Sequence, residues 1–306
     1  MNREDLCEEL LHTLRSAGFI LSTKCPTHLS CFDFAARSEE DAILVRTSCR
    51  SNLVSKESAR ELAWIGSNLS ATPLIVCLNG SGKPMKDDTI YLRHRIRTIT
   101  PQTFRNVVER GDHPLVEARP GGFYVRLDGE AIRRRRSEAG LSLGELASMI
   151  GVSRRTIYGY ECGLGKASVG VALKLEATFG VPVVRQTNLF RERLWAPGRT
   201  LRLRTWKAPC IEVAEKLIEL GYKVAPVSMA PFDFVAVKDP KERIIGGLTG
   251  RDDAHDRREL SSSIADALSC HSLFIAEESR FNGPGTVSKE DFLSIREPEQ
   301  LHKLLV

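Results

Sequence analysis

The sequence lacks any long hydrophobic run. No stretch approaches the roughly 20 consecutive apolar residues that a membrane-spanning helix needs. The opening, MNREDLCEELL, is acidic and has a helical pattern, whereas an export signal would carry a basic front and an apolar core. We therefore expect a cytoplasmic protein without a membrane partner.

Closely spaced metal ligands are also missing. The eight cysteines include no C-x-x-C pair, and several stand in apolar runs such as LIVCL, which favours reduced, buried thiols over disulfides or zinc. The seven histidines show no ligand spacing. NGSGKP at 79–84 lacks the spacing of a phosphate-binding loop and is typical of a turn. Neither a metal nor a cofactor is expected.

Positive charge is present but unevenly spread. The chain has a formal net charge of +5, yet residues 129–207 hold 15 Lys or Arg against 6 Asp or Glu. The remaining residues hold 29 against 33. A basic block between near-neutral flanks indicates a polyanionic partner for that block, although a charged run is often only a solvated face.

The first 110 residues alternate helical and strand patterns. Helices are expected over about 4–18 and 55–69 and again from Thr100, with short strands at FIL, FDFAA, AILVRT and TPLIVCL. The order helix, three strands, helix, strand predicts a small mixed sheet with helices packed on it.

The end of the chain repeats this plan. FDFVA at 232–236 matches FDFAA at 32–36, and a helix with RRELSS matches one with ARELAW. Further matches in the same order pair IEVAEKLIELGYKV with CEELLHTLRSAGFIL, HSLFIAEE with TPLIVCL, and VSKEDF with ITPQTF. The preserved order favours two related domains over coincidence.

The middle of the chain contains clear turn and helix signals. VEARPGGFYVRL predicts a hairpin that turns at 120–122. A helix through 133–136 should end at Gly140, and Ser142 should begin the next helix in a capping box with Glu145. Residues 151–153 then form the turn before a helix capped by Ser153.

The apolar positions of these helices repeat at helical spacing. They predict a small core of Leu143, Leu146, Ala147, Ile150, Ile157 and Tyr160, to which a later helix adds Val171, Leu173, Leu175 and Phe179.

Residues 129–184 resemble the lambda-repressor/Cro-like helix-turn-helix family, on LGELASMIGVSRRTIYGYE and the following helix that ends at Gly180. In that family the second helix of the motif enters the major groove, and its first turn meets the bases. The resemblance implies double-stranded DNA as partner. The contacting side chains would be Ser153, Arg154, Arg155, Thr156 and Tyr158. The alternative is a helical hairpin used only for packing.

Additional DNA contacts are expected around this turn. Four consecutive helical residues at 133–136 sweep around the helix axis and cannot all face DNA, so Arg133 and Arg136 are the two expected to reach phosphate. Ser142 and Lys166 complete the predicted set. The arginine-rich segment 185–207 is expected to be a linker or strand pair and is a candidate for more phosphate contacts.

The flanking segments resemble the PD-(D/E)XK nuclease-like fold, in their order of elements and in the position of Asp33. Catalytic members need an acid and a lysine two residues apart on the next strand, to hold Mg²⁺ and orient water. In AILVRT these places fall on Leu44 and Arg46, and RIIGGLTG near the C-terminus has no acid. We therefore expect Asp33 and Asp233 to cap or orient strands, without catalysis.

These patterns predict an α/β plus all-α fold. Two small, duplicated mixed-sheet domains at 1–110 and 208–306 should flank a hairpin linker at 111–128, a four- or five-helix repressor-like domain at 129–184 and a basic linker at 185–207. This order resembles a family of archaeal helix-turn-helix transcriptional regulators. We expect a sequence-specific DNA-binding regulator, a homodimer, with an unknown small-molecule effector. A divergent metal-dependent nuclease and an antitoxin-like regulator are the alternatives.

Overall fold

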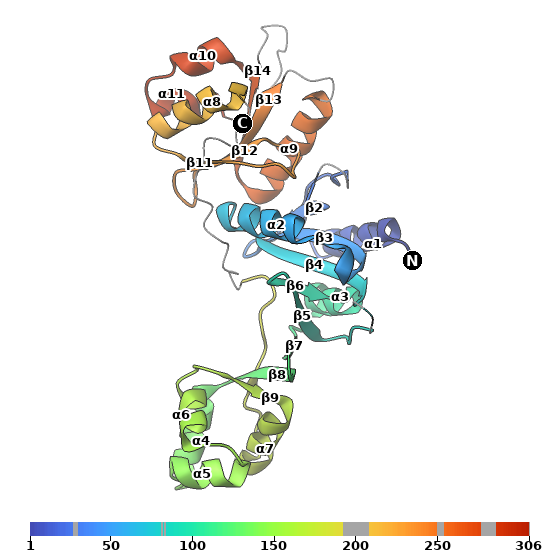
Figure 1. Cartoon of the computed structure of the whole chain (residues 1–306), viewed down its shortest axis with the longest axis vertical. Helices are drawn as coiled ribbons and strands as arrows, with labels where there is room; N and C mark the ends of the chain where they lie inside the picture. Colours follow the sequence, from blue (N-terminus) through green and yellow to red (C-terminus); the bar gives the residue numbers. More distant parts are fainter. Residues whose placement is uncertain are drawn as a thin grey trace. The chain divides into compact units, whose positions relative to one another are not determined.

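The computed structural model describes residues 1–26, 30–80, 82, 84–191, 208–249, 254–276 and 286–305. The chain divides into two compact units. One contains Met1–Val76, Arg93–Ile96 and Phe190–Val306, and the other contains Cys77–Leu92 and Arg97–Leu189. Figure 1 shows the elements of both. No helix in the described ranges is long and apolar enough to cross a bilayer.

The first unit opens with a helix on a small sheet. Helix α1 (Arg3–Ser16) starts at a capping box between Asn2 and Asp5, and its buried leucines lie one helical turn apart. Three strands, a short 3-10 turn, a helix and a fourth strand follow: β1 (Ile20–Leu21), β2 (Phe34–Arg37), β3 (Ala42–Arg50), η1 (Ser51–Leu53), α2 (Lys56–Asn68) and β4 (Thr72–Asn79). The predicted elements of this segment are all present.

The last hundred residues add a second sheet to the same unit. Its elements are α8 (Ala208–Glu219), β11 (Lys223–Pro226), β12 (Phe234–Val237), β13 (Arg243–Thr249), α9 (Ala254–Leu268), β14 (His271–Ala276), β15 (Thr286–Ser288), α10 (Lys289–Ser294) and α11 (Pro298–His302). The strands lie in chain order, antiparallel from β11 to β13 and parallel from β13 to β15. In Figure 1, α8 and α10 cover one face of this sheet and α9 the other.

The two sheets of the first unit contact each other through matching elements. Helix α9 packs against β1 and β2, and α2 packs against β12. Arg37 Nε donates to the carbonyl oxygen of Ala267 at 3.1 Å, and the main-chain N of Ser228 donates to Glu61 Oε1 at 2.9 Å. Glu61 is only 1% exposed, so this interface buries a carboxylate together with its hydrogen-bond donor.

The second unit contains a further group of strands. These are β5 (Thr89–Arg93), β6 (Ile96–Ile99), β7 (Val116–Arg119), β8 (Gly122–Leu127), β9 (Lys166–Ser168) and β10 (Val184–Arg185), with α3 (Pro101–Arg110) between β6 and β7. Along the sheet the order is β6-β5-β7-β8-β10, and β9 pairs with β8. The predicted hairpin at 120–122 is confirmed, because β7 and β8 pair across it.

Strands β5 and β6 were not predicted. The turn between them uses His94 and Arg95, with φ of 48° and 72°. Neither residue is a glycine or an asparagine, which are the usual marks of left-handed backbone in a turn, so the sequence carried no local signal.

Four helices complete the second unit: α4 (Gly129–Glu138), α5 (Leu143–Ile150), α6 (Arg154–Glu161) and α7 (Val169–Phe179). Their common core contains the residues predicted from α5 and α6 and also Leu175. The prediction for Leu173 is wrong, since this side chain is 60% exposed. Ala172 and Leu175, three residues apart, share the buried face of α7 instead, and Leu173 lies off that face.

All eight cysteines are unbridged. Burial was predicted for them, and it holds for six of the eight, but Cys162 is exposed and Cys49 is half-buried. Cys162 is exposed because it caps the C-terminus of α6, where the chain leaves the core.

Candidate nucleic-acid interface

Helix α5 is fixed at both ends by local sequence. Ser142 Oγ accepts from the main-chain N of Glu145 at 3.2 Å, and Glu145 Oε2 accepts from the main-chain N of Ser142 at 2.7 Å. Gly151 ends the helix with φ of 82°, a conformation that glycine adopts without a steric cost. The predicted capping box and turn are therefore confirmed.

Helix α6 is anchored through one face. Ile157 is fully buried and Tyr160 is 8% exposed, both against the core shared with α5 and α7. Gly129, at the start of α4, lies so close that a Cβ there would stand 2.5 Å from the carbonyl oxygens of Tyr160 and Glu161. The end of α6 is thus held tightly, and its orientation in the unit is set.

The first turn of α6 faces solvent. Ser153 caps the helix, since its Oγ accepts from the main-chain N of Thr156 at 3.0 Å. Arg154 and Arg155 follow at the exposed N-terminus, and Tyr158 one turn later is 55% exposed. A helix N-terminus with two arginines attracts an anion both by its main-chain N–H groups and by charge.

Arg133 of α4 is exposed and lies beside this turn. The pKa of Tyr158 is raised by a hydrogen bond with Cys162, and the positive charge of Arg133 opposes that rise. The structure therefore brings together Arg133 and Tyr158 from two helices on one surface.

Arg136 is directed inward. Its Nε and Nη2 contact the two carboxylate oxygens of Glu161 at 2.6 and 3.1 Å, and its Nη1 donates to the carbonyl oxygen of Leu141 at 2.9 Å. The bond with Glu161 raises the pKa of Arg136, which keeps its charge firmly in place. This fork ties α4 to the end of α6.

Lys166 has a partner as well. It stands on β9 and forms an ion pair with Glu117 of β7. Arg136 and Lys166 remain predicted DNA-binding residues, but each already neutralises a carboxylate, unlike Arg154 and Arg155 at the open end of α6.

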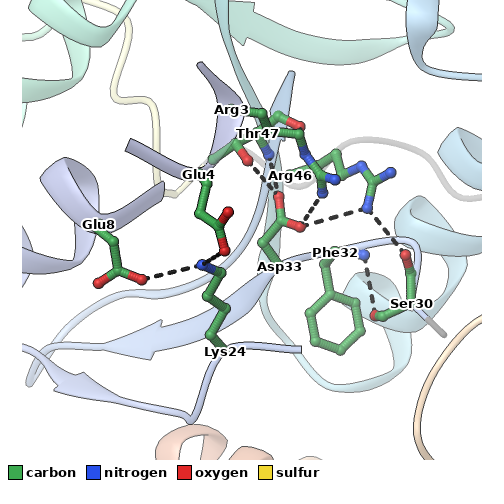
Figure 2. A network of polar contacts seen from close by, with 9 residues as sticks. All are labelled: Arg3, Glu4, Glu8, Lys24, Ser30, Phe32, Asp33, Arg46 and Thr47. Carbon is green, nitrogen blue, oxygen red and sulfur yellow. Dashed lines mark hydrogen bonds and ion pairs between the residues drawn. The ribbon is translucent and has the colours of Figure 1, made fainter. Parts of the chain in front are cut away.

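A second polar network surrounds Asp33 in the first unit, shown in Figure 2. Asp33 Oδ2 accepts from the main-chain N of Thr47 at 2.6 Å and from its Oγ1 at 2.7 Å. Its other oxygen forms ion pairs with Arg3 and, at 3.5 Å, with Arg46. Burial lowers the pKa of Arg46, and the charge of Asp33 opposes that shift. The carboxylate is only 4% exposed.

Asp233 has a related environment near the other sheet. Its Oδ2 accepts from the main-chain N of Leu248 at 3.0 Å, and its Oδ1 pairs with Arg257 of α9 at 2.8 Å. Gly247 is required here, because a Cβ would lie 2.7 Å from Asp233 Oδ2. Both aspartates bind a neighbouring strand, in agreement with the predicted orienting role.

These residues do not fit the magnesium ion that a PD-(D/E)XK fold implies. Leu44 is fully buried where a second carboxylate is needed, and Arg46 replaces the lysine. Asp33 already accepts from Thr47, Arg3 and Arg46, so its oxygens face cations and donors of the protein itself. A lone carboxylate neutralised in this way is a poor cation ligand.

Sequence reasoning did not find Arg3 or Arg257 as partners of the two aspartates. Both cations lie on helices, 30 and 24 residues away from the aspartate along the chain. No short motif links such positions, so only the folded arrangement reveals them.

Comparison with known proteins agrees with this description. A family described as PD-(D/E)XK superfamily domain matches residues 3–114, and one described as Helix-turn-helix matches residues 132–185. The chain is 32% identical to a relative from Halorubrum lacusprofundi, over all of this chain and 97% of that one. A relative from Methanocaldococcus jannaschii is 34% identical, over 90% of this chain and 87% of that one. One from Pyrococcus horikoshii is 32% identical, over 92% and 89%.

The exposed first turn of α6, held on a buried helix-turn-helix core, places the chain in the helix-turn-helix class. The three relatives share the name "Putative HTH-type transcriptional regulatory protein". The chain belongs to this family, whose relatives here come from archaea, and it joins the helix-turn-helix region to a PD-(D/E)XK-like domain.

Proposed function

We propose that the protein is a sequence-specific transcriptional regulator that reads the major groove of double-stranded DNA with helix α6. The observation that carries this proposal is the exposed cationic N-terminus of α6 on a rigidly packed motif. Arg154 and Arg155 would contact bases, while Ser153, Thr156 and Tyr158 would contact bases or phosphates. Such a regulator would act in the cytoplasm, where the DNA lies.

Four further positions complete the proposed surface. Arg133 stands beside Tyr158 and would bind phosphate, and Ser142 would do so at the start of α5. Arg136 and Lys166 would contribute through the field of their ion pairs. We further propose domain boundaries near residues 110, 129, 184 and 208, with the segments at 1–110 and 208–306 related by duplication.

We also propose that the protein is a homodimer without enzymatic activity and that the α/β domains serve as a scaffold or sense an effector. A fold does not dictate chemistry, so a nuclease-like architecture is compatible with a binding role. A nuclease directed by the helix-turn-helix is the second candidate, favoured by the family match over residues 3–114.

The proposed function is tested by Arg154→Ala and Arg155→Ala, measured by fluorescence anisotropy on a selected site and on random duplex. Loss of one two-pronged arginine contact should weaken binding at the selected site by about 1–3 kcal/mol and leave random binding less affected. Arg134→Ala is the charge-matched control, because this arginine is 68% exposed on α4. If neither α6 variant narrows the difference between the two DNAs, α6 is not the reading helix.

A further inference from the structure

One face of the small sheet in the second unit carries an excess of positive charge. Residues paired across neighbouring strands share a face, and β8 pairs Arg126 with Lys166 of β9 and with Arg185 of β10. Glu117 pairs with Tyr124, and Arg119 with Gly122, which places these on the same face. The described positions of this face in β7 to β10 are Glu117, Arg119, Gly122, Tyr124, Arg126, Lys166, Ser168 and Arg185. We call it the cationic sheet face.

The opposite face of the same strands is apolar and buried. Val125 and Leu127 of β8 and Ala167 of β9 alternate with the charged positions and join the core of helices α4 to α7. Period-two alternation therefore separates an inner face that packs on the helix-turn-helix from an outer face with four cations and one carboxylate.

The like charges on this face are direct neighbours. Arg126 stands opposite Lys166 on one side and opposite Arg185 on the other. Like charges directly opposite each other destabilise a sheet. The acids nearby are fewer than the cations: Glu117 contacts Lys166, Arg119 and Arg126, and Asp128 contacts Arg185 at 2.9 Å. Two carboxylates among four cations leave a net charge of +2.

The cations are accessible to a large anion. The side chains of Arg119, Arg126 and Arg185 are 44%, 39% and 60% exposed. Glu117, in contrast, is 6% exposed and lies beneath them. The carboxylate thus positions the cations from below and leaves their outer surfaces toward solvent.

We propose that the cationic sheet face binds the phosphate backbone of duplex DNA, as a sequence-independent contact surface separate from the first turn of α6. This inference rests on the proposed DNA-binding function and deepens it. Both surfaces belong to one compact unit, because the inner face of the sheet shares the core of the helix-turn-helix. The α6 contact supplies sequence preference, and the sheet face supplies affinity that depends on salt.

The test uses the full-length chain with Arg119→Ser and Arg185→Ser combined, two exposed positions whose loss leaves the core intact. Affinity for a selected site and for random duplex is measured by anisotropy between roughly 50 and 200 mM salt. Each lost phosphate contact should make the slope of log K against log salt less negative by about 0.9. Two lost contacts narrow the affinity change over this salt range by about tenfold, equally for both DNAs.

Two further variants sharpen the result. Arg110→Ser removes an exposed charge from α3 outside the face and should leave the slope as in the wild type. Glu117→Gln adds positive charge to the face and should steepen the slope. Wild-type slopes in the double variant, or an equal change in Arg110→Ser, would overturn the proposal.

The two proposals fail separately. If the wild type shows no preference for any selected site but the double variant still lowers the salt slope on random duplex, sequence reading by α6 is wrong and the sheet-face proposal stands. If the Arg154 variant loses preference while the double variant binds like the wild type, the reverse holds.

Discussion

Nη1 of Arg46 lies 3.5 Å from Oδ1 of Asp33, so a permanently charged guanidinium stands where a catalytic PD-(D/E)XK domain has its lysine. Arginine is planar, always protonated and suited to pairing with a carboxylate, whereas lysine can orient a single water. This pair closes the place that a metal ion would need.

We therefore expect no DNA cleavage. Purified protein is incubated with duplex, single-stranded and branched DNA in Mg²⁺ or Mn²⁺, and products are resolved on denaturing gels. All substrates should remain intact. Cleavage that disappears in Asp33→Ala would reverse this conclusion and promote the nuclease reading.

The contact between the two sheets of the first unit should be important for stability. Arg243 donates to the carbonyl oxygens of Leu69, Leu268 and Ser269, the latter two at 3.1 and 3.2 Å, and is 9% exposed. Arg243→Met leaves these buried acceptors without that donor, so the free energy of unfolding should fall by about 1–3 kcal/mol. Urea denaturation followed by circular dichroism measures it. Arg258→Met, on a half-buried arginine of α9, is the control and should change little. An equal loss in both variants would contradict a specific role for Arg243.

The stability of the hairpin should depend on pH. Burial raises the pKa of Glu117, but its bonds with Lys166 and the nearby charge of Arg119 outweigh burial and lower it below the usual 4.5. A lowered pKa stabilises the fold above pH 4.5, and the stabilisation is lost as pH falls through the folded pKa. Wild type and Glu117→Gln should therefore differ in urea midpoint at pH near 7 and converge toward about pH 3. A difference that is constant over this range would show that the charge of Glu117 contributes nothing.

The homodimer can be tested directly. A lone helix-turn-helix reads few base pairs, and regulators of this class gain affinity by engaging two half-sites about one helical turn apart. Light scattering at micromolar concentration should give twice the chain mass of 34.0 kDa. A mass of one chain, unchanged by DNA, would favour the alternative that the two α/β segments pair only within the chain, through α9 and α2.

The helix-turn-helix could be predicted closely because its signals are local. Ser142, Gly151 and Ser153 mark helix ends by capping and left-handed backbone, and each acts within three residues. The buried places of Ile157 and Tyr160 follow from their spacing alone.

The remaining features depend on contacts that spacing does not encode. Arg3 and Arg257 meet their aspartates only when a helix packs on a sheet. The cationic sheet face likewise requires a register, since Arg126, Lys166 and Arg185 come from three strands far apart in the chain. Alternation within β8 showed which residues share a side, but not which strands lie next to it.

The packing of α9 on β1 and β2 bears on how the protein is made. Helix α9 begins at Ala254, 217 residues after β2 ends at Arg37. A ribosome adds about 5–20 residues per second, so the outer side of β2 waits tens of seconds for its cover while the helix-turn-helix is translated and can fold. A nascent chain must keep this surface out of unwanted association, and synthesis that stops after the central unit releases a DNA-reading domain attached to an unfinished sheet.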